Sequence, residues 1–351
     1  MHPTRGTTTS PPPSSPTPHL AELTRRARTL HTDLDGALTL ATELTDITHG
    51  LGRGRTSEYL HTLSALGRGD LTVARIVEPH LDAHAILHQA GSTPADLEPV
   101  HATPRSTWGV YAAHAPHLEL NAENTAHGWR LTGGKPWCSL PDKISHALIT
   151  AHTGPDRRRL FAIDLRHPGV HIEPGTWAAR GLTAITTAEL TLTDVPAVPV
   201  GDDNWYLTRP GFAWGGIGVA AIWTGGAHGL AAALHHAAAR REPDQIALLH
   251  LGRVDETLWT ADLALHEAAR TIDAGTTDPH LGPRVRAVAA RTAETVIAVV
   301  GHALGPAPLT HDEEHARRVA DLTVYIRQHH AERDLAALGR TLLSTPPGPP
   351  R

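Results

Sequence analysis

A lysine, a tryptophan and a serine stand at alternate positions in the segment GWRLTGGKPWCSL, residues Gly128–Leu140. On a β-strand successive side chains point to opposite faces, so Trp137 and Ser139 would share one face. A flat indole beside a hydroxyl can hold a flat heteroaromatic ring, since the indole stacks and the hydroxyl donates or accepts a hydrogen bond. The alternative is that Trp137 is a core residue closing a strand pair and Ser139 lies in a turn.

Cys138, between these two residues, is the single cysteine of the chain. A lone cysteine can be a nucleophile, but strand alternation points Cys138 to the face opposite Trp137 and Ser139, which favours a packed, inert thiol. One cysteine also excludes a disulfide framework and any zinc or iron–sulfur site built from several cysteines.

Three histidines, His80, His84 and His88, recur four residues apart and would lie on one face of a helix. Two such side chains can bind a metal ion. The chain has no His-Glu-x-x-His motif and no evident second group of ligands, and 27 histidines make such a spacing common by coincidence. We therefore predict no metal site.

Two glycine-rich segments resemble ligand-binding loops. Gly216, Gly218 and Ala221 match G-x-G-x-x-A, but a dinucleotide fingerprint must follow a strand, and only Phe212–Trp214 lies between Pro210 and these glycines. We predict close helix packing there instead. The segment Gly52–Asp70 places several arginines beside glycines and could meet a phosphate or a CoA-like group, but a solvated loop–helix–loop is the prediction.

The order of hydrophobic patterns defines the elements that would position these residues. Helical spacing fills residues 19–104, with Asp70 as an N-cap, Gly91 as a helix end, and a kink or break at Pro79. Residues 105–205 read as seven short strands with turns between them. Residues 206–343 return to four long helices, roughly 211–241, 245–274, 282–303 and 312–343. Residues 1–18 and 344–351 are Pro-rich tails predicted to be disordered.

Composition and charge limit the partners and the location. The net charge is −5 and the sequence pI is about 6.6, which argues against nucleic acid as a partner. No uninterrupted apolar run approaches the roughly 18 residues that span a bilayer, and the first 18 residues lack the apolar region of a secretory signal. We predict a soluble, cytoplasmic protein that does not bind a membrane.

The succession of helices, a β module and long helices resembles the acyl-CoA dehydrogenase family. Gly128–Leu140 is similar to that family's G-(Y/W)-x-L-x-G-x-K-x-W-I-(T/S) segment, and Ala179–Pro199 is similar to the segment that closes its β domain. The resemblance spans about residues 20–343 and implies an α+β multidomain fold. Its parts would be an N-terminal helical domain, a middle antiparallel β-barrel or sandwich, and a C-terminal four-helix bundle.

In that family FAD lies between the β module and the bundle. The resemblance places Trp137 beside the flavin ring and the Ser139 hydroxyl near flavin N5. The family's first flavin-contacting strand, T-E-P-x-A-G-S-D, is replaced here by WGVYAAHAPH, so the pyrimidine edge would be contacted by backbone from Tyr111 to Ala113.

The family's pyrophosphate-binding R-x-Q-F-G segment is also missing, and the matching region reads RREPDQIALLHLG. Arg240 or Arg241 could still meet phosphate.

The usual catalytic glutamate is absent from both positions that the family uses. Asp321 matches the family's Arg-Asp pair, and the expected glutamate falls at or near His329 or His330. Glu332, three residues beyond His329, is a possible displaced base. Histidine is a good proton donor near neutral pH, and some flavin monooxygenases of this fold place one near the flavin. We predict that His329 or His330 reaches the flavin, the alternative being that both are exposed helix residues.

The resemblance thus implies an FAD-dependent oxidoreductase that oxidises a Cα–Cβ bond of an acyl thioester, possibly a CoA thioester, or of a related substrate. Two alternatives stay open: a two-component flavin monooxygenase fed by a separate reductase, and a catalytically degenerate scaffold paralogue without flavin. The family's habit implies a homodimer or homotetramer. The electron acceptor is not indicated by the sequence.

Overall fold

The computed structural model describes residues 18–175, 177–240 and 242–344. The two predicted tails lie outside the described residues, except for Pro18 and Ser344, which begin and end helices.

Helices form the N-terminal part of the chain, as predicted. Asp70 caps the longest of them by accepting a hydrogen bond from the Val73 N–H at 3.1 Å, and Gly91 ends it in the left-handed conformation at φ 71°. This helix runs without a break through Pro79, so the predicted split there is wrong. The elements are α1 (Pro18–Thr29), α2 (Leu34–Glu43), η1 (Thr45–Gly50), α3 (Thr56–Gly69), α4 (Leu71–Ala90) and η2 (Ala95–Val100).

Helix α3 is packed in the core, which corrects the prediction of a solvated loop–helix–loop over Gly52–Asp70. A Cβ added to Gly67 would lie 2.4 Å from the backbone oxygen of Ile222, so the two helices touch backbone to backbone. Tyr59, Leu63 and Leu66 are fully buried on the same helix. The prediction failed because apolar side chains at helical spacing outweigh the flanking arginines.

The middle of the described chain forms the seven strands expected from the sequence. Five of them close into a barrel in the order β4-β2-β3-β7-β5 and back to β4, with β1 added to β4 and β6 to β7. The strands are β1 (Trp108–Tyr111), β2 (Leu120–Thr125), β3 (Gly128–Ser139), β4 (His146–Gly154), β5 (Arg157–Asp164), β6 (Val170–Ile172) and β7 (Thr187–Val200).

We expected an antiparallel barrel, but not all of its strand pairs are antiparallel. Strand β4 pairs parallel with β1 and, through one residue pair, with β2, whereas the other pairings are antiparallel. The β2–β3 hairpin turns the chain back before β4 begins, and β4 then enters beside β1 in the same direction.

Long helices return after the barrel. The predicted fourth helix, 312–343, is interrupted at His329–Ala331, where His329 is extended and Ala331 has φ 46°. No proline or glycine marks this break in the sequence. The helical elements are α5 (Trp205–Thr208), α6 (Gly211–Ala238), α7 (Gln245–Asp273), α8 (Leu281–Leu304), α9 (Ala307–His311), α10 (Glu313–Tyr325), η3 (Ile326–Gln328) and α11 (Glu332–Ser344).

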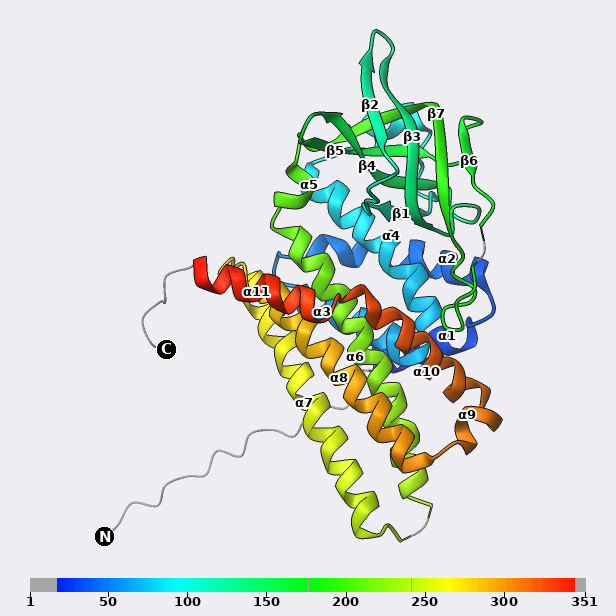
Figure 1. Cartoon of the computed structure of the whole chain (residues 1–351), viewed down its shortest axis with the longest axis vertical. Helices are drawn as coiled ribbons and strands as arrows, with labels where there is room; N and C mark the ends of the chain where they lie inside the picture. The colour runs from blue at the N-terminus through cyan, green and yellow to red at the C-terminus, as the bar shows by residue number, and fades with distance from the viewer. Residues whose placement is uncertain (1–17, 176, 241, 345–351) are drawn as a thin grey trace, which may run out of the picture.

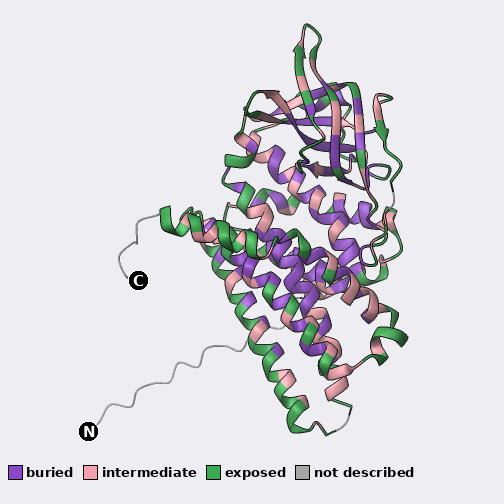
Figure 2. Cartoon of the chain, in the orientation of Figure 1, coloured by how far each residue is buried: buried purple, intermediate pink, exposed green. Residues whose placement is uncertain are grey.

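Helices α4 and α6 join the barrel to the bundle. In Figure 1 α4 rises from the helical half toward the barrel, and α6 descends from the barrel into the bundle beside α8. Figure 2 shows buried residues inside the barrel and along the crossing helices below it. By length and composition α6 and α8 could each cross a membrane, but 67% of the apolar window of α6 is buried inside the protein. A core position explains the hydrophobicity of α6.

Candidate active site

Ser139 ends strand β3 where the barrel meets α4. Its Oγ accepts a hydrogen bond from Arg75 Nη2 at 3.3 Å and lies 3.1 Å from Thr187 Oγ1 on β7. Its carbonyl oxygen accepts from the Tyr111 hydroxyl at 2.8 Å. Three elements therefore fix Ser139, and Tyr111 acts as a buried support through its side chain.

Trp137 stands out from the barrel two residues earlier. Its side chain is 65% exposed, and its backbone has φ 60°, in the left-handed region that a tryptophan rarely adopts. The β3–β7 register shifts between Lys135 and Cys138, so a bulge re-aims the indole. Cys138 is fully buried, and burial raises the pKa of its thiol far above the usual range, as expected for an inert residue.

Arg75 connects Ser139 to a buried carboxylate that our sequence reading missed. Arg75 Nη1 lies 3.8 Å from Glu78 Oε2, one turn along α4. Burial raises the pKa of Glu78 to about 7, although the positive charges of Arg75 and Arg286 act in the opposite direction. A carboxyl group with this pKa can both take and give a proton near neutral pH. A charged pair three residues apart among the apolar residues of the first half of α4 was the available signal.

Arg286 and Tyr325 close this cluster from the bundle side. The Arg286 guanidinium lies 4.8 Å from the centre of the Trp223 ring and donates to the carbonyl oxygens of Gly216 and Gln328 at 3.1 and 2.9 Å. Tyr325 is buried, and its ring centre is 5.9 Å from the Arg75 guanidinium carbon. We call Ser139, Arg75, Glu78, Arg286 and Tyr325 the Ser139 cluster.

The structure separates the two candidate histidines. His329 is 8% exposed in the loop before α11, and its Nε2 is 3.9 Å from Asp334 Oδ2. Burial, aided by the charge of Arg286, lowers the pKa of His329. His330 is exposed and pairs with Asp334 Oδ1 at 3.3 Å. Glu332 is exposed in the first turn of α11. Of these three candidates His329 is the one linked to the Ser139 cluster, because Arg286 donates to the carbonyl oxygen of Gln328, the residue before it.

Ala113 does not share the buried surroundings of Tyr111. It is exposed and borders a small hollow that Lys135 and His152 also line. The ammonium group of Lys135 donates to the carbonyl and hydroxyl oxygens of Thr150, both at 2.7 Å, and burial lowers its pKa to about 8. Ala113 and Tyr111 thus face different surroundings.

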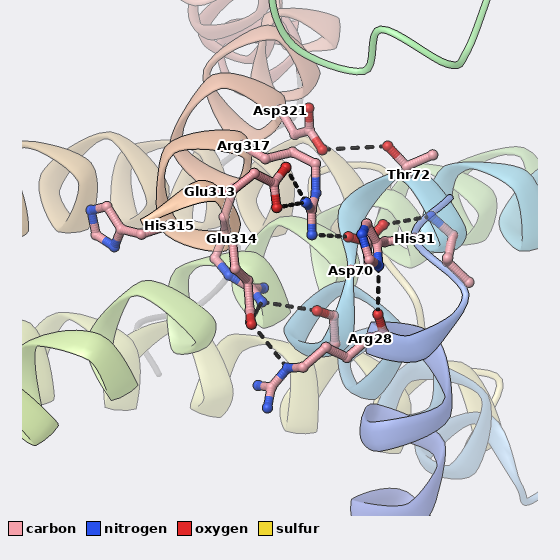
Figure 3. A network of polar contacts seen from close by, with 12 residues as sticks. Arg28, His31, Asp70, Thr72, Glu313, Glu314, His315, Arg317 and Asp321 are labelled. Carbon is pink, nitrogen blue, oxygen red and sulfur yellow. Dashed lines mark hydrogen bonds and ion pairs between the residues drawn. The ribbon is translucent and has the colours of Figure 1, made fainter. Parts of the chain in front are cut away.

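Asp321, the residue matched to an Arg-Asp pair, has a structural position. It accepts a hydrogen bond from the Leu182 N–H of the barrel at 2.6 Å and one from Thr72 Oγ1 of α4 at 3.4 Å. Figure 3 shows it within a wider network in which Arg317 pairs with Asp70 at 3.3 Å. Burial raises the pKa of Asp321 to about 6. The network fixes α10 against the barrel and the N-terminal helices.

The histidine stripe on α4 also has structural contacts. His80 Nδ1 accepts from the Trp108 N–H at 3.3 Å, and its Nε2 lies 3.0 Å from Thr45 Oγ1. Burial lowers the pKa of His80 to about 3, so it stays neutral. Within the described ranges, no three His, Cys, Asp or Glu side chains are grouped to hold a metal ion.

The remaining candidates are the glycines of α6 and the arginines after it. Gly216 and Gly218 are inside α6, where an added Cβ would come within 3.1 Å of Arg286 Cδ and 3.0 Å of Leu63 Cδ1, as close helix packing requires. Arg240 is exposed beyond the end of α6, and Arg241 lies outside the described residues.

Comparison with known proteins identifies the fold. No protein-family profile matches the sequence, and no curated protein resembles it. Glutaryl-CoA dehydrogenase from Mycobacterium smegmatis superposes with a TM-score of 0.76 at 18% identity, covering 95% of this chain and 96% of its own. Butyryl-CoA dehydrogenase from Megasphaera elsdenii gives 0.75 at 17% identity, covering 94% and 100%.

FMN-bound TdsC from Paenibacillus sp. A11-2 gives 0.75 at 15% identity, covering 93% and 96%. Each likeness extends over almost the whole of both chains, barrel and helices alike. The chain therefore has the fold of the acyl-CoA dehydrogenases, as the resemblance in its sequence implied.

Proposed function

We propose that the protein is a flavin-dependent oxidoreductase whose flavin ring lies between the barrel and the bundle at Trp137 and Ser139. The observation that carries this proposal is the exposed indole of Trp137 in a strained backbone conformation. Two residues later, the Ser139 hydroxyl accepts a hydrogen bond from Arg75, which pairs with the buried Glu78. Backbone strain of this kind concentrates at functional sites. An exposed flat ring and a neighbouring hydroxyl fit a flavin, which when bound would accept two electrons from a substrate.

We propose FAD as the cofactor and dehydrogenation of an acyl thioester or related substrate at Cα–Cβ as the reaction. The likeness to glutaryl-CoA and butyryl-CoA dehydrogenases supports both. Glu78 would take the proton from the substrate carbon, since its pKa is near 7. Arg75 and Arg286 would stabilise the ionised form of Glu78 that accepts the proton, and Tyr325 and Trp223 would exclude water.

A second candidate is a two-component monooxygenase, with FMN as the alternative cofactor. It is favoured by His329, whose Nε2 is buried without a hydrogen-bond partner among the described residues, and by the likeness to FMN-bound TdsC. A separate reductase would then supply the electrons. His329 would hold or deliver a proton beside Arg286.

The first experiment is titration of the purified protein with FAD and with FMN, followed by visible absorbance and flavin fluorescence. Ser139→Ala should weaken binding of the preferred flavin roughly tenfold through the loss of one hydrogen bond. Trp137→Ala should weaken it similarly, whereas Trp259→Ala, which removes another exposed indole on α7, should not. Absence of binding by either flavin would leave the scaffold paralogue as the remaining interpretation.

Two variants separate the two reactions. In a dehydrogenase, Glu78→Gln should lower turnover of acyl-CoA thioesters about a hundredfold or more, because a general base is lost. In a monooxygenase, His329→Ala should lower oxygen incorporation into an aromatic substrate, measured by product mass, and His330→Ala should not. Equal turnover rates for His329→Ala and the unaltered protein would show that His329 takes part in neither mechanism.

The assembly and location remain proposals. We propose a homodimer or homotetramer, because several large apolar side chains on α7 are exposed, among them Ile246, Leu249, Trp259 and Leu263. We further propose a cytoplasmic protein without nucleic-acid or membrane partners, on the net charge of −5. Light scattering coupled to size-exclusion chromatography measures the oligomeric state, and a monomer at micromolar concentration would contradict the proposed oligomer.

A further inference from the structure

A cavity of about 270 Å³ opens at the other end of α4, away from the Ser139 cluster. Arg75 and His88 are 13 residues apart on this helix, which corresponds to about 20 Å. Residues from η1 and the following loop, α4, α5 and the start of α6 form its walls. They are Thr48, Leu51, Gly52, Arg53, Ala85, His88, Gln89, Trp205, Arg209, Pro210 and Trp214.

The cavity carries two buried hydrogen-bonding nitrogens that have no partner. Among the described residues, Arg209 Nε and His88 Nε2 are shielded from solvent and make no hydrogen bond. Leaving such groups unpaired in a folded protein is costly and uncommon, so each calls for an explanation. Protein atoms cover these two nitrogens, but the residues that carry them, Arg209 and His88, both line the cavity and give it polar walls.

The charge around this space is positive. Arg209 is 5% exposed, donates from Nη1 to Gln89 Oε1 at 2.5 Å, and has Asp82 only at 3.9 Å from Nη2. Arg53 is exposed at the rim and has no ion pair in the part of the chain that the structure describes. Burial lowers the pKa of His88, so its ring is neutral and adds a donor or an acceptor without charge. Arg209 also lies over the Tyr206 ring, 5.3 Å from its centre, but among the described residues Asp82 at 3.9 Å is its one carboxylate partner, which favours an anion.

The walls are flat and aromatic. Trp205 and Trp214 both line the cavity, and the Arg209 guanidinium carbon is 5.9 Å from the Trp205 ring centre. Two glycines let the wall residues pack closely: a Cβ on Gly52, at φ 70°, would lie 2.6 Å from the Trp214 ring, and one on Gly211 would lie 2.3 Å from Arg209 Nη1. A cavity of about 150 Å³ holds benzene, so this one has space for a substituted ring.

We propose that this cavity binds a small aromatic carboxylate, with its ring between the tryptophans and its carboxylate at Arg209, Arg53 and His88. The positive charge of Arg209 and Arg53 accounts for the carboxylate, and the indole walls account for the ring. This site uses no residue of the Ser139 cluster and does not depend on flavin binding.

The test is calorimetric titration of the whole protein with benzoate, benzamide and inorganic phosphate. Benzoate should bind at least about tenfold more tightly than benzamide, which keeps the ring without the charge, because charge-assisted hydrogen bonds are the stronger. Benzoate should also bind more tightly than phosphate, which keeps the charge without the ring, by a similar factor. Equal affinity for benzoate and either of the other two probes would overturn the proposal, as would no benzoate binding.

Variants locate the binding. Ala85→Leu fills the cavity without changing a charge and should abolish benzoate binding. Arg53→Gln should weaken it severalfold with little effect on folding, since Arg53 is exposed. The matched control is Arg291→Gln, another exposed arginine, on α8. Circular dichroism checks that each variant folds, and unchanged benzoate affinity in Arg53→Gln overturns the proposal even if Ala85→Leu fails to fold.

Discussion

Helix α4 places polar side chains near both of its ends, and their surroundings differ. Near its start, Arg75 pairs with Glu78 and donates to Ser139 in an interface that Tyr325 and Arg286 fill. Near its end, His88 and the Arg209 side chain that follows α5 line an open cavity. The first arrangement contributes to the fold itself, whereas the second is completed only by something that binds. Substitutions at the two ends should therefore change different measured quantities.

The largest effect on stability is expected at the closed end. At pH 8, where Glu78 is ionised, Glu78→Ala leaves Arg75 without its counter-charge and should lower the free energy of unfolding by about 3 to 5 kcal/mol, measured by urea denaturation. Glu294→Ala is the control, because its pair with Arg327 is half exposed and such pairs contribute less than about 1 kcal/mol. Similar losses in both variants would contradict the view that the Ser139 cluster is a self-neutralised core.

The same carboxylate should make stability depend on pH. The pKa of Glu78 is raised from 4.5 to about 7, so the folded protein holds this proton more tightly than the unfolded chain. The stabilisation it provides is fully present below pH 4.5 and is lost as pH rises through 7. Relative to Glu78→Gln, the free energy of unfolding of the unaltered protein should fall by on the order of 2 kcal/mol between pH 4.5 and pH 8. Parallel pH profiles for the two proteins would show that Glu78 does not titrate in this way.

A smaller effect, of opposite sign, is expected at the open end. Ala85→Leu adds apolar volume to a cavity that has room for it and should raise the free energy of unfolding by about 1 kcal/mol. Thermal unfolding without ligand measures this. A loss of more than about 1 kcal/mol, the usual mark of overpacking, would mean that the space is narrower than the structure has it.

The smallest effect is expected at the rim of the cavity. Arg53→Gln should leave the free energy of unfolding within about 0.5 kcal/mol of the unaltered protein, because the side chain is exposed and unpaired in the described part of the chain. Together with weakened benzoate binding, this would separate the open end from the closed one. A large loss of stability from Arg53→Gln would remove that distinction.

Much of the fold could be predicted because its signals are local. Alternating residues marked the seven strands of the described barrel, Asp70 and Gly91 marked the ends of α4, and the helices on either side followed from apolar spacing. The errors occurred where distant packing decides the outcome: α3 became buried against α6, and the last predicted helix broke at His329–Ala331.

The candidate site was predictable only in its strand residues. Cys138 is buried, as strand alternation predicts, but a bulge and the positive φ of Trp137 break the alternation within the same segment, so the shared face of Trp137 and Ser139 stays a prediction. Glu78 could not be selected, since its role depends on Arg75 meeting Ser139, 64 residues away. His329 and His330 were indistinguishable in sequence, and only packing buried one and exposed the other.

The sequence by itself determined the order of helices, barrel and helices, the scarcity of Cys and Lys, and the Trp137–Ser139 pair, because these depend on neighbours along the chain. The tertiary structure alone decided that Arg75 of α4 meets Ser139, that the second half of α4 packs against the barrel, and that its end borders a cavity. Arg209 reaches Gln89 across 120 residues, and Asp321 reaches Leu182 across 139. Contacts between segments so far apart depend on how whole helices pack, which no local pattern records.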